Sequence, residues 1–362
     1  MTKQPDHKYE IVKQYFINFI QKNDLKKGDK VFSENEAMER LKVSRHTVRK
    51  AIGDLINEGW LISVKGMGTF VNDPGAFINK PSKLIGVITT YITDYIFPEI
   101  IAGLEDVFHR KGYNIMLGNT SNEIEKERQC LLNFLGQDLA GVVIDATKSA
   151  YPSANIDLLN EFRKRKIPVL FIHSYYREFD SSYVVENDEY GGYTGTLHLI
   201  KRGMKKPAGI FKSDDMQGHL RYKGFLKALS ENSMSIEDDN IIWFNTYDKK
   251  NMLNKTNSGF IDGRIIDILG RCDGILCYND EIAYYVLEIA KKTGIKIPEN
   301  CRLVGFDDSK LAIMADVKLT SVSHPKNELG RITAESIIKM INKSETFVKM
   351  VIKPELIVRE ST

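Results

Sequence analysis

The sequence predicts a mixed α/β protein with two unequal parts, a small helical domain that ends in a β-hairpin and a large domain built on parallel sheets. At 362 residues the chain is longer than one ordinary domain. Apolar residues recur at helical spacing in the first 60 residues, and a short hairpin pattern follows. From residue 83 onward, short apolar runs alternate with helical segments, which is typical of doubly wound parallel sheets.

The composition is that of a globular protein, with 42% hydrophobic and 27% charged residues. The net charge of +3 is unevenly distributed, because residues 1–72 contain 13 basic and 9 acidic residues while the remainder is almost neutral. A basic head joined to a neutral body favours a nucleic-acid-binding module attached to a second domain.

The four cysteines form no CxxC pair, so we expect reduced thiols and neither a disulfide framework nor a zinc site. The N-terminus shows no signal-peptide pattern, and no apolar run approaches the length needed to span a bilayer. We therefore expect a cytoplasmic protein that uses no membrane, metal or cofactor.

Three helices are predicted in the first 60 residues. The first carries an apolar stripe that we expect to be buried, formed by Ile11, Val12, Tyr15, Phe16, Phe19 and Ile20. Ser33 begins the second helix, and Glu36 three residues later completes a capping-box pattern. Ser44 begins the third helix, which Gly59 ends. Two short helices with a tight connection between them indicate a helix-turn-helix.

A hairpin follows these helices. Residues 60–64 (WLISV) and 68–72 (GTFVN) alternate as two strands, joined by Lys65, Gly66 and Met67. The order of three helices and a hairpin predicts a winged helix-turn-helix over residues 1–72.

The third helix begins with basic residues. Arg45 and Arg49 lie four positions apart and so share a face, with His46 beside them. The first turn of a recognition helix meets the major groove, where an arginine fork can contact guanine or phosphate. Lys50 and Lys65 could reach phosphates on either side. The alternative is a solvated basic helix face with no partner.

The segment from residue 8 to 72 resembles the DNA-binding domain of the GntR family. The residues that carry the resemblance are Ser33–Glu36, Val43–Arg49, Ala51, Ile52, Leu55, Glu58, Gly59 and Gly66–Val71. The resemblance implies that the protein binds near-palindromic double-stranded DNA as a homodimer, with the wing tip in the minor groove. It implies the following DNA-binding residues: Glu34, Ser44, Arg45, His46, Thr47, Arg49, Lys65 and Gly66.

Residues 73–82 contain two prolines and a glycine and lack periodicity, so we expect an interdomain linker there. The large domain should then cover residues 83–362 and contain about ten strands in two lobes. The clearest strands are LIGVIT, NIMLG, GVVID, PVLFIH, AGIF, GILCY and RLVGF.

Ligands of doubly wound sheets bind beyond the carboxyl ends of the strands. Side chains near these ends and on adjacent helices are therefore the candidate ligand-binding residues: Tyr91, Asp94, Tyr95, Phe97, Asp145, Lys148, His173, Tyr175, Arg221, Asn279 and Asp307. Their mixture of charged, amide and aromatic groups suits a sugar, whose hydroxyls need polar partners and whose C–H faces need aromatic rings.

Structural roles are the alternative for several of these positions. Tyr91 or Phe97 could pack beneath a neighbouring helix, and His173 could be a satisfied histidine at the edge of the core. Asp280 could cap the helix that follows it, and either Asp307 or Asp308 could be a turn residue.

Residues 83–360 resemble the effector domain of the LacI/GalR family, which is related to the two-lobed, type I periplasmic sugar-binding proteins. The resemblance rests on Ile85–Val87, Gly141–Ile144, Ile167–Val169, Arg221–Phe225, Tyr278–Ala283, Ile297–Pro298, Val304–Asp308 and Leu319–Val322. It implies that Arg221, Asn279 and Asp307 contact the sugar.

A GntR-type head on a LacI/GalR-type body is similar to the arabinose-responsive repressors of Gram-positive bacteria. The stretches Thr89–Pro98 and Pro354–Ile357 add to this resemblance. It implies a repressor of arabinose-utilisation genes that L-arabinose releases from its operator. The alternatives are a regulator that responds to another monosaccharide, or a sugar-binding transport protein. We expect no enzymatic activity, because the sequence has no Walker, GxGxxG or GxSxG motif.

Overall fold

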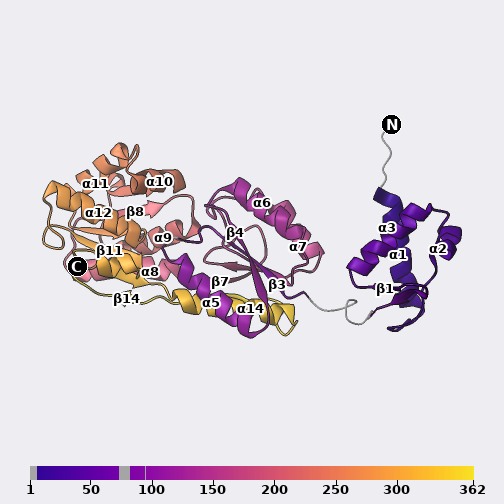
Figure 1. Cartoon of the computed structure of the whole chain (residues 1–362). Coiled ribbons are helices and arrows are strands. Elements are labelled where there is room, and N and C mark those ends of the chain that lie inside the picture. The colour runs from indigo at the N-terminus through magenta and orange to yellow at the C-terminus, as the bar shows by residue number, and fades with distance from the viewer. Residues whose placement is uncertain (1–5, 73–81, 94) are drawn as a thin grey trace. The chain divides into compact units, whose positions relative to one another are not determined.

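The computed structural model describes residues 6–72, 82–93 and 95–362, and the chain divides into two compact units, Met1–Pro81 and Ser82–Thr362 (Figure 1). Of the predicted linker 73–82, only Ser82 is among the described residues. Each unit has its own hydrophobic core.

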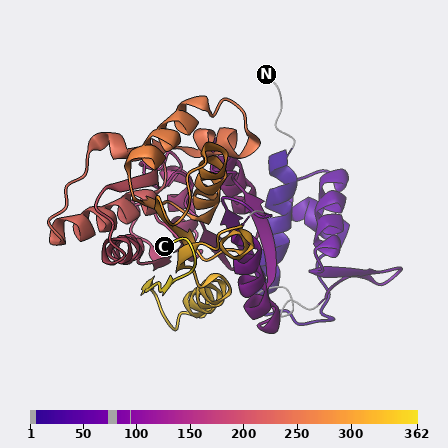
Figure 2. The ribbon, with the colours of Figure 1, turned by 90° about the vertical axis from the view of Figure 1, so that its left-hand side faces the viewer.

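The first unit has three helices and a hairpin: α1 (Asp6–Lys22), α2 (Glu34–Leu41), α3 (Arg45–Asn57), β1 (Leu61–Val64) and β2 (Gly68–Val71). The two strands pair antiparallel, with Leu61 opposite Val71 and Val64 opposite Gly68. The hairpin extends beyond the three helices of this unit (Figure 2). The predicted winged helix-turn-helix is therefore present.

Of the predicted buried stripe on α1, Ile11 is exposed and Tyr15 and Phe19 are only partly buried. Val12, Phe16 and Ile20 are spaced four residues apart and are almost fully buried, but Ile11 is 53% exposed. Successive residues of a helix point about 100° apart, so Ile11 lies beside the buried face. The core of this unit also contains Phe32, whose ring packs against Phe16 and Phe19.

The first lobe of the second unit is a six-stranded parallel sheet in the order β13-β7-β6-β5-β3-β4. Helices α6 and α7 cover one face of the sheet, and α5 and α14 cover the other (Figure 1). The elements of this lobe are β3 (Leu84–Thr89), α5 (Phe97–Arg110), β4 (Asn114–Asn119), α6 (Ile124–Leu135), β5 (Gly141–Ile144), α7 (Ile156–Lys164), β6 (Val169–Ile172), β7 (Ser182–Glu186), α14 (Lys326–Ile341) and β13 (Lys349–Ile352).

The second lobe is a six-stranded sheet in the order β14-β12-β11-β10-β8-β9, in which the edge strand β14 alone is antiparallel. Its elements are α8 (Asp188–Lys201), β8 (Pro207–Lys212), α9 (Met216–Glu231), the 3-10 helix η1 (Asp238–Asn240), β9 (Ile241–Phe244), α10 (Thr246–Asn254), α11 (Gly259–Arg271), β10 (Gly274–Cys277), α12 (Asp280–Thr293), β11 (Arg302–Asp307), α13 (Lys310–Met314), β12 (Thr320–Ser323) and β14 (Leu356–Ile357).

The chain passes between the lobes three times, after β7, after β12 and after β13. The seven strands that the sequence predicted most clearly are all present in the two lobes. The strands β7, β9, β12, β13 and β14 complete the sheets. All five are only two to five residues long, and β12 (TSVS) also contains polar residues that weaken its apolar signal.

Two helix pairs pack very closely because glycines lie where the helices cross. On α8 and α9, a Cβ added at Gly192 would lie 2.1 Å from the carbonyl oxygen of Arg221, and one at Gly224 would lie 2.0 Å from that of Glu189. Gly103 and Gly330 form the equivalent crossing of α5 and α14. Close packing of this kind fixes each helix relative to its neighbour.

Substituting Gly224 by Ala should therefore destabilise the second unit, by about 1–3 kcal/mol or more, since the added methyl group meets backbone atoms. The measurement is urea-induced unfolding of the full chain followed by circular dichroism. Gly263→Ala on α11 is the control, because a Cβ there meets nothing within 4 Å and alanine favours a helix by about 1 kcal/mol. Equal stability of the two variants would contradict the close-packing argument.

Candidate functional site

The start of α3 is fixed by two capped helices. Ser33 and Glu36 form the predicted capping box at the start of α2. Lys42 ends α2 in the left-handed conformation, and the Ser44 side chain then accepts a hydrogen bond from the Thr47 backbone N–H. Ser44 and Thr47, both predicted to lie at DNA, thus have structural roles at the start of α3.

Two arginines project from the exposed face of α3 and are held by residues of α2. Arg45 donates a hydrogen bond to the Asn35 side chain at 2.9 Å. Arg49 donates from Nε to both carboxylate oxygens of Glu34 at 3.0 and 2.9 Å. Because Arg45, His46 and Arg49 are exposed while Val48 and Ala51 are buried, α3 is amphipathic, with its basic side facing solvent.

The predicted wing tip is also exposed. Lys65 and Gly66 lie in the turn between β1 and β2, and Gly66 has a φ of 82°, which favours glycine. Lys65 and the α3 arginines are thus basic side chains on two separate elements of the same small unit. Such an arrangement can contact DNA in two places.

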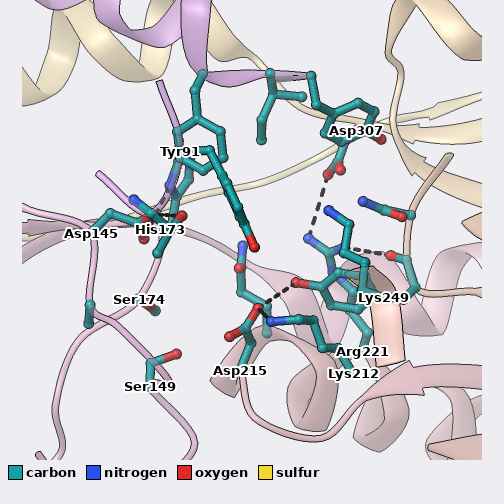
Figure 3. Close-up of a pocket in the computed structure, with 18 residues that line it drawn as sticks. Tyr91, Asp145, Ser149, His173, Ser174, Lys212, Asp215, Arg221, Lys249 and Asp307 are labelled. Atoms are coloured by element: carbon teal, nitrogen blue, oxygen red, sulfur yellow. Dashed lines mark hydrogen bonds and ion pairs between the residues drawn. The ribbon is translucent and has the colours of Figure 1, made fainter. Parts of the chain in front are cut away.

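The second unit contains a cleft of about 660 Å³, including its open mouth, between the two sheets (Figure 3). It lies at the carboxyl ends of β3, β5, β6, β8, β10 and β11. This is where the sequence analysis placed it, from the rule that ligands of doubly wound sheets bind beyond the carboxyl ends of the strands (the strand-end rule). Eight of the predicted ligand-binding residues line it: Tyr91, Tyr95, Phe97, Asp145, His173, Arg221, Asn279 and Asp307.

Three other predicted residues are not part of this lining. Tyr175 points elsewhere and stacks on Tyr183, with ring centroids 4.3 Å apart. Lys148 lies in a turn with a φ of 47°, where its backbone N–H donates to the Asn122 side chain. Asp94 lies outside the described residues.

Arg221 is the central charged group of the cleft. Its side chain is 2% exposed, and its Nε donates to Asp188 at 2.8 Å while Nη1 donates to the Tyr278 carbonyl at 2.6 Å. Asp307 lies 3.7 Å from Nη2, and the Phe306 ring lies 4.2 Å from the guanidinium carbon. Burial alone would lower the pKa of Arg221, but the two carboxylates outweigh it and raise that pKa.

A second polar group faces Arg221 from the first lobe. Asp145 accepts hydrogen bonds from the backbone N–H and the hydroxyl of Thr90, at 3.2 and 2.6 Å. His173 Nδ1 lies 3.6 Å from the other oxygen of Asp145, and the His173 ring packs edge-on against Phe97. The first lobe thus offers a carboxylate beside aromatic rings (Figure 3).

Sequence reasoning missed a third group of residues at this cleft. Lys212 Nζ lies 2.6 Å from Asp215 and 2.9 Å from Asp214, and the Tyr278 hydroxyl donates to Asp215 at 3.1 Å. Lys212 ends β8, so the strand-end rule could have found it had β8 been extended by one residue. Lys249, which pairs with Glu281 at 2.5 Å, comes from α10, for which no sequence signal was identified. The remaining lining residues include Thr90, Ser149, Ser174 and Gln217.

The alternative in which Asp280 caps the helix that follows it is wrong. Asn279 caps α12 by accepting a hydrogen bond from the Ile282 N–H. Asp280 is fully buried and accepts hydrogen bonds from the Ser309 backbone N–H at 2.7 Å and the Ser321 hydroxyl at 2.7 Å. Burial, and then the charge of Asp307, raise the pKa of Asp280 to about 7.

Several hydrogen bonds join the two lobes across the cleft. The Tyr95 hydroxyl donates to the Phe306 carbonyl and accepts from the Asp280 N–H. The Asn122 side chain donates to Thr246 at 2.7 Å and to Asp215 at 3.2 Å. The lobes are therefore held together in a closed arrangement around the polar lining.

No helix among the described residues is long and apolar enough to cross a membrane. Within those residues no cluster of histidine, cysteine and carboxylate side chains could hold a metal ion.

Comparison with known proteins agrees with both parts of this architecture. A model of the gntR family of bacterial regulatory proteins matches residues 8–71, and a model of the periplasmic binding protein-like domain matches residues 196–362. A solved structure of a periplasmic binding protein/LacI transcriptional regulator from Alkaliphilus metalliredigens, complexed with D-xylulofuranose, is similar at 26% identity and a TM-score of 0.66. The similarity covers 78% of this chain and 99% of that chain.

Two relatives match this chain over almost their whole length. The chain is 36% identical over 357 residues to the arabinose metabolism transcriptional repressor of Geobacillus stearothermophilus, covering 98% of this chain and 97% of that protein. It is 37% identical over 366 residues to the repressor of the same description from Halalkalibacterium halodurans, covering 98% and 96%. The chain belongs to the family of arabinose metabolism transcriptional repressors, with a gntR-type DNA-binding domain followed by a periplasmic-binding-protein-like domain.

Proposed function

We propose that this repressor acts in the cytoplasm as a homodimer that binds operator DNA upstream of arabinose-utilisation genes and leaves it when L-arabinose enters the cleft. The observation that carries the proposal is the closed cleft in which Arg221 and Asp307 of one lobe face Asp145 and His173 of the other. The protein acts by binding and not by catalysis.

The cleft has the chemistry that a pentose requires. Carboxylates such as Asp145 and Asp307 accept hydrogen bonds from hydroxyl groups, and Arg221 and Lys212 donate to them. Tyr91 and Phe97, whose ring centroids are 5.7 Å apart, offer an apolar surface for the C–H groups of the sugar. A site built of buried polar groups also rejects analogues that lack a hydroxyl, since a group is then left unpaired.

In this proposal the first unit makes the contacts with DNA. Arg45, His46 and Arg49 would read or clamp the major groove, and Lys65 and Gly66 at the wing tip would enter the minor groove. Glu34 and Asn35 hold the two arginines before DNA arrives, which reduces the conformational freedom that these side chains lose on binding.

The two activities are coupled if the sugar binds the closed arrangement better than an open one, since a ligand shifts an equilibrium only by its differential affinity. The direct test is fluorescence anisotropy of a labelled duplex from the arabinose promoter region, titrated with protein with and without L-arabinose. We expect release by L-arabinose and not by D-ribose. Equal DNA affinity with and without every pentose tested would contradict the proposal.

A different monosaccharide is the second candidate effector, because a periplasmic binding protein/LacI regulator of similar fold was solved with D-xylulofuranose. Calorimetric titration with L-arabinose, D-xylose, D-ribose and D-galactose distinguishes the two. Binding of another sugar alone would leave the repressor mechanism in place and change only its signal.

Asp145→Asn should weaken L-arabinose binding about tenfold or more, because a hydrogen bond to a charged group contributes about 1.5–3 kcal/mol. The asparagine oxygen can still accept from Thr90, so the strand end should keep its shape. Calorimetry measures the change, with the exposed Asp138→Asn of the same lobe as the control. An unchanged Kd in Asp145→Asn would exclude Asp145 from the effector site.

Arg45→Ala should weaken operator binding about tenfold or more and leave L-arabinose affinity unchanged, because one base or phosphate contact contributes about 1–3 kcal/mol. If the lost contact is to phosphate, the slope of log affinity against log salt should also fall by about one. Lys111→Ala, which removes the same charge from the second unit, is the control. Operator affinity equal to that of the control would remove Arg45 from the DNA interface.

A further inference from the structure

Asn122 lies outside the lining of the effector cleft but joins its two lobes. It belongs to the turn between β4 and α6 in the first lobe, and neither Asn122 nor its partner Thr246 lines the cleft. Asn122 is 1% exposed and has a φ of 56°, a left-handed conformation that asparagine adopts more readily than most residues. A polar side chain so deeply buried needs hydrogen-bond partners.

The Asn122 side chain divides its hydrogen bonds between the lobes. Its Oδ1 accepts from the Lys148 backbone N–H at 2.7 Å, within the first lobe. Its Nδ2 donates to Thr246 Oγ1 at 2.7 Å and to Asp215 Oδ1 at 3.2 Å, both in the second lobe. The reverse orientation of the amide would place its NH2 group against the Lys148 N–H, so these neighbours determine the orientation. Both N–H donors of the Asn122 amide therefore bind the second lobe.

The two acceptors of Asn122 are held in place inside the second lobe. The backbone N–H and the hydroxyl of Thr246 both donate to Asp214, at 3.0 and 2.7 Å, so the hydroxyl keeps its lone pairs for Asn122. Asp215 Oδ2 accepts from Lys212 Nζ at 2.6 Å, while Oδ1 accepts from Asn122 (Figure 3). Since Lys212 lines the cleft, a single carboxylate separates Asn122 from a group that binds the sugar in the proposed function.

Contact with the first lobe also completes the start of α9, the helix that carries Arg221. Its N-cap residue Asp215 makes no side-chain capping hydrogen bond among the described residues, and the Met216 N–H donates instead to Ser149 Oγ of the first lobe at 2.9 Å. The first four N–H groups of a helix have no partner within the helix, so Ser149 satisfies one that opening would return to water. Asn122 and Ser149 thus bind adjacent residues at the amino end of α9.

We propose that Asn122 is a positioning residue for the effector, which acts without touching it. Its amide holds the amino ends of α9 and α10 against the first lobe and so keeps the bound sugar enclosed. Opening of the cleft would separate Asn122 from Thr246 and Asp215, because these residues lie on different lobes. The identity of the enclosed sugar rests on the proposed function, whereas the closure does not.

Asn122→Asp separates this role from a local one. An aspartate keeps the oxygen that accepts from Lys148 and tolerates the left-handed conformation, but it loses both N–H donors and places a second carboxylate beside Asp215. We expect the Kd for L-arabinose to rise about tenfold or more, mainly through faster dissociation, because the closed arrangement loses two hydrogen bonds. Calorimetry measures the Kd, and stopped-flow fluorescence measures the two rate constants.

Two further variants locate the effect. Thr246→Val removes the acceptor on the second lobe and should also weaken binding, and the double variant should lose less than the product of the two single losses, because both remove one contact. Asn114→Asp, at the exposed start of β4, introduces the same charge into the first lobe and is the matched control. The Kd of the control in Asn122→Asp, losses that multiply in the double variant, or a loss through slower association alone would overturn the proposal.

The closure itself can be measured without sugar, by pulsed electron paramagnetic resonance on the full-length chain. Spin labels at Glu125→Cys on α6 and Lys250→Cys on α10 report the separation of the lobes (Figure 1). A Cys130→Ser background is used, because the other three cysteines are buried. We expect a short-distance population in the labelled chain, and we expect Asn122→Asp to lower the ratio of short to long distances about tenfold.

The outcomes separate this proposal from the proposed function. If L-arabinose does not bind but Asn122→Asp still lowers the ratio of short to long distances, the proposed function fails and the role of Asn122 in closure is supported. An equal ratio in the two chains, both without sugar and with it, would overturn the role of Asn122 whether or not the sugar binds. The same conclusion would follow if no short-distance population formed under either condition.

Discussion

The buried guanidinium of Arg221 is the interaction on which the effector domain depends. It joins the start of α8 through Asp188, the end of β10 through the Tyr278 carbonyl, and the end of β11 through Asp307. An unpaired buried charge is strongly destabilising, so these three segments must stay within reach of one side chain. The close crossing of α8 and α9 at Gly192 and Gly224 makes this possible, because it brings Asp188 and Arg221 to 2.8 Å. The same charge also lines the cleft, so in the proposed function one group would serve both the fold and the recognition of a polar ligand.

The domain order and most of the cleft could be predicted from sequence because their signals are local. Caps at Ser33 and Ser44 give the helix starts, and the strand-end rule finds Asp145, His173, Asn279 and Asp307 without knowledge of the sheet order. The sequence does not indicate the direction in which each side chain near a strand end points. Tyr175 is two residues beyond His173, yet it lies outside the lining of the cleft and stacks on Tyr183. Its partner is on β7 (SYVVE), a five-residue strand that was not among the strands predicted most clearly, so nothing local indicates where the ring points.

Asp280 illustrates the same limit. A carboxylate at the start of an amphipathic helix predicts a cap, and Asn279 takes that role instead. The Asp280 side chain reaches Ser309 and Ser321, 29 and 41 residues away, and a Cβ at Gly305 would lie 2.2 Å from its oxygen. Only the packed sheet brings these positions together. The lining residue Lys249 was missed for a similar reason, since it comes from a segment with no predicted element and meets Glu281 only in the folded lobe.

The hydrogen bonds between the lobes explain how a small ligand could change the conformation of a much larger protein. Tyr95 binds Phe306 and Asp280, and Asn122 binds Thr246, so closure replaces hydration of these groups by direct hydrogen bonds across the cleft. Each such exchange contributes only about 0.5–1.5 kcal/mol, so closed and open arrangements can lie close in free energy. A bound sugar that pairs with groups of both lobes adds its affinity to the closed side alone. In the proposed function, a difference of a few kcal/mol between the two arrangements would be enough to change which of them predominates.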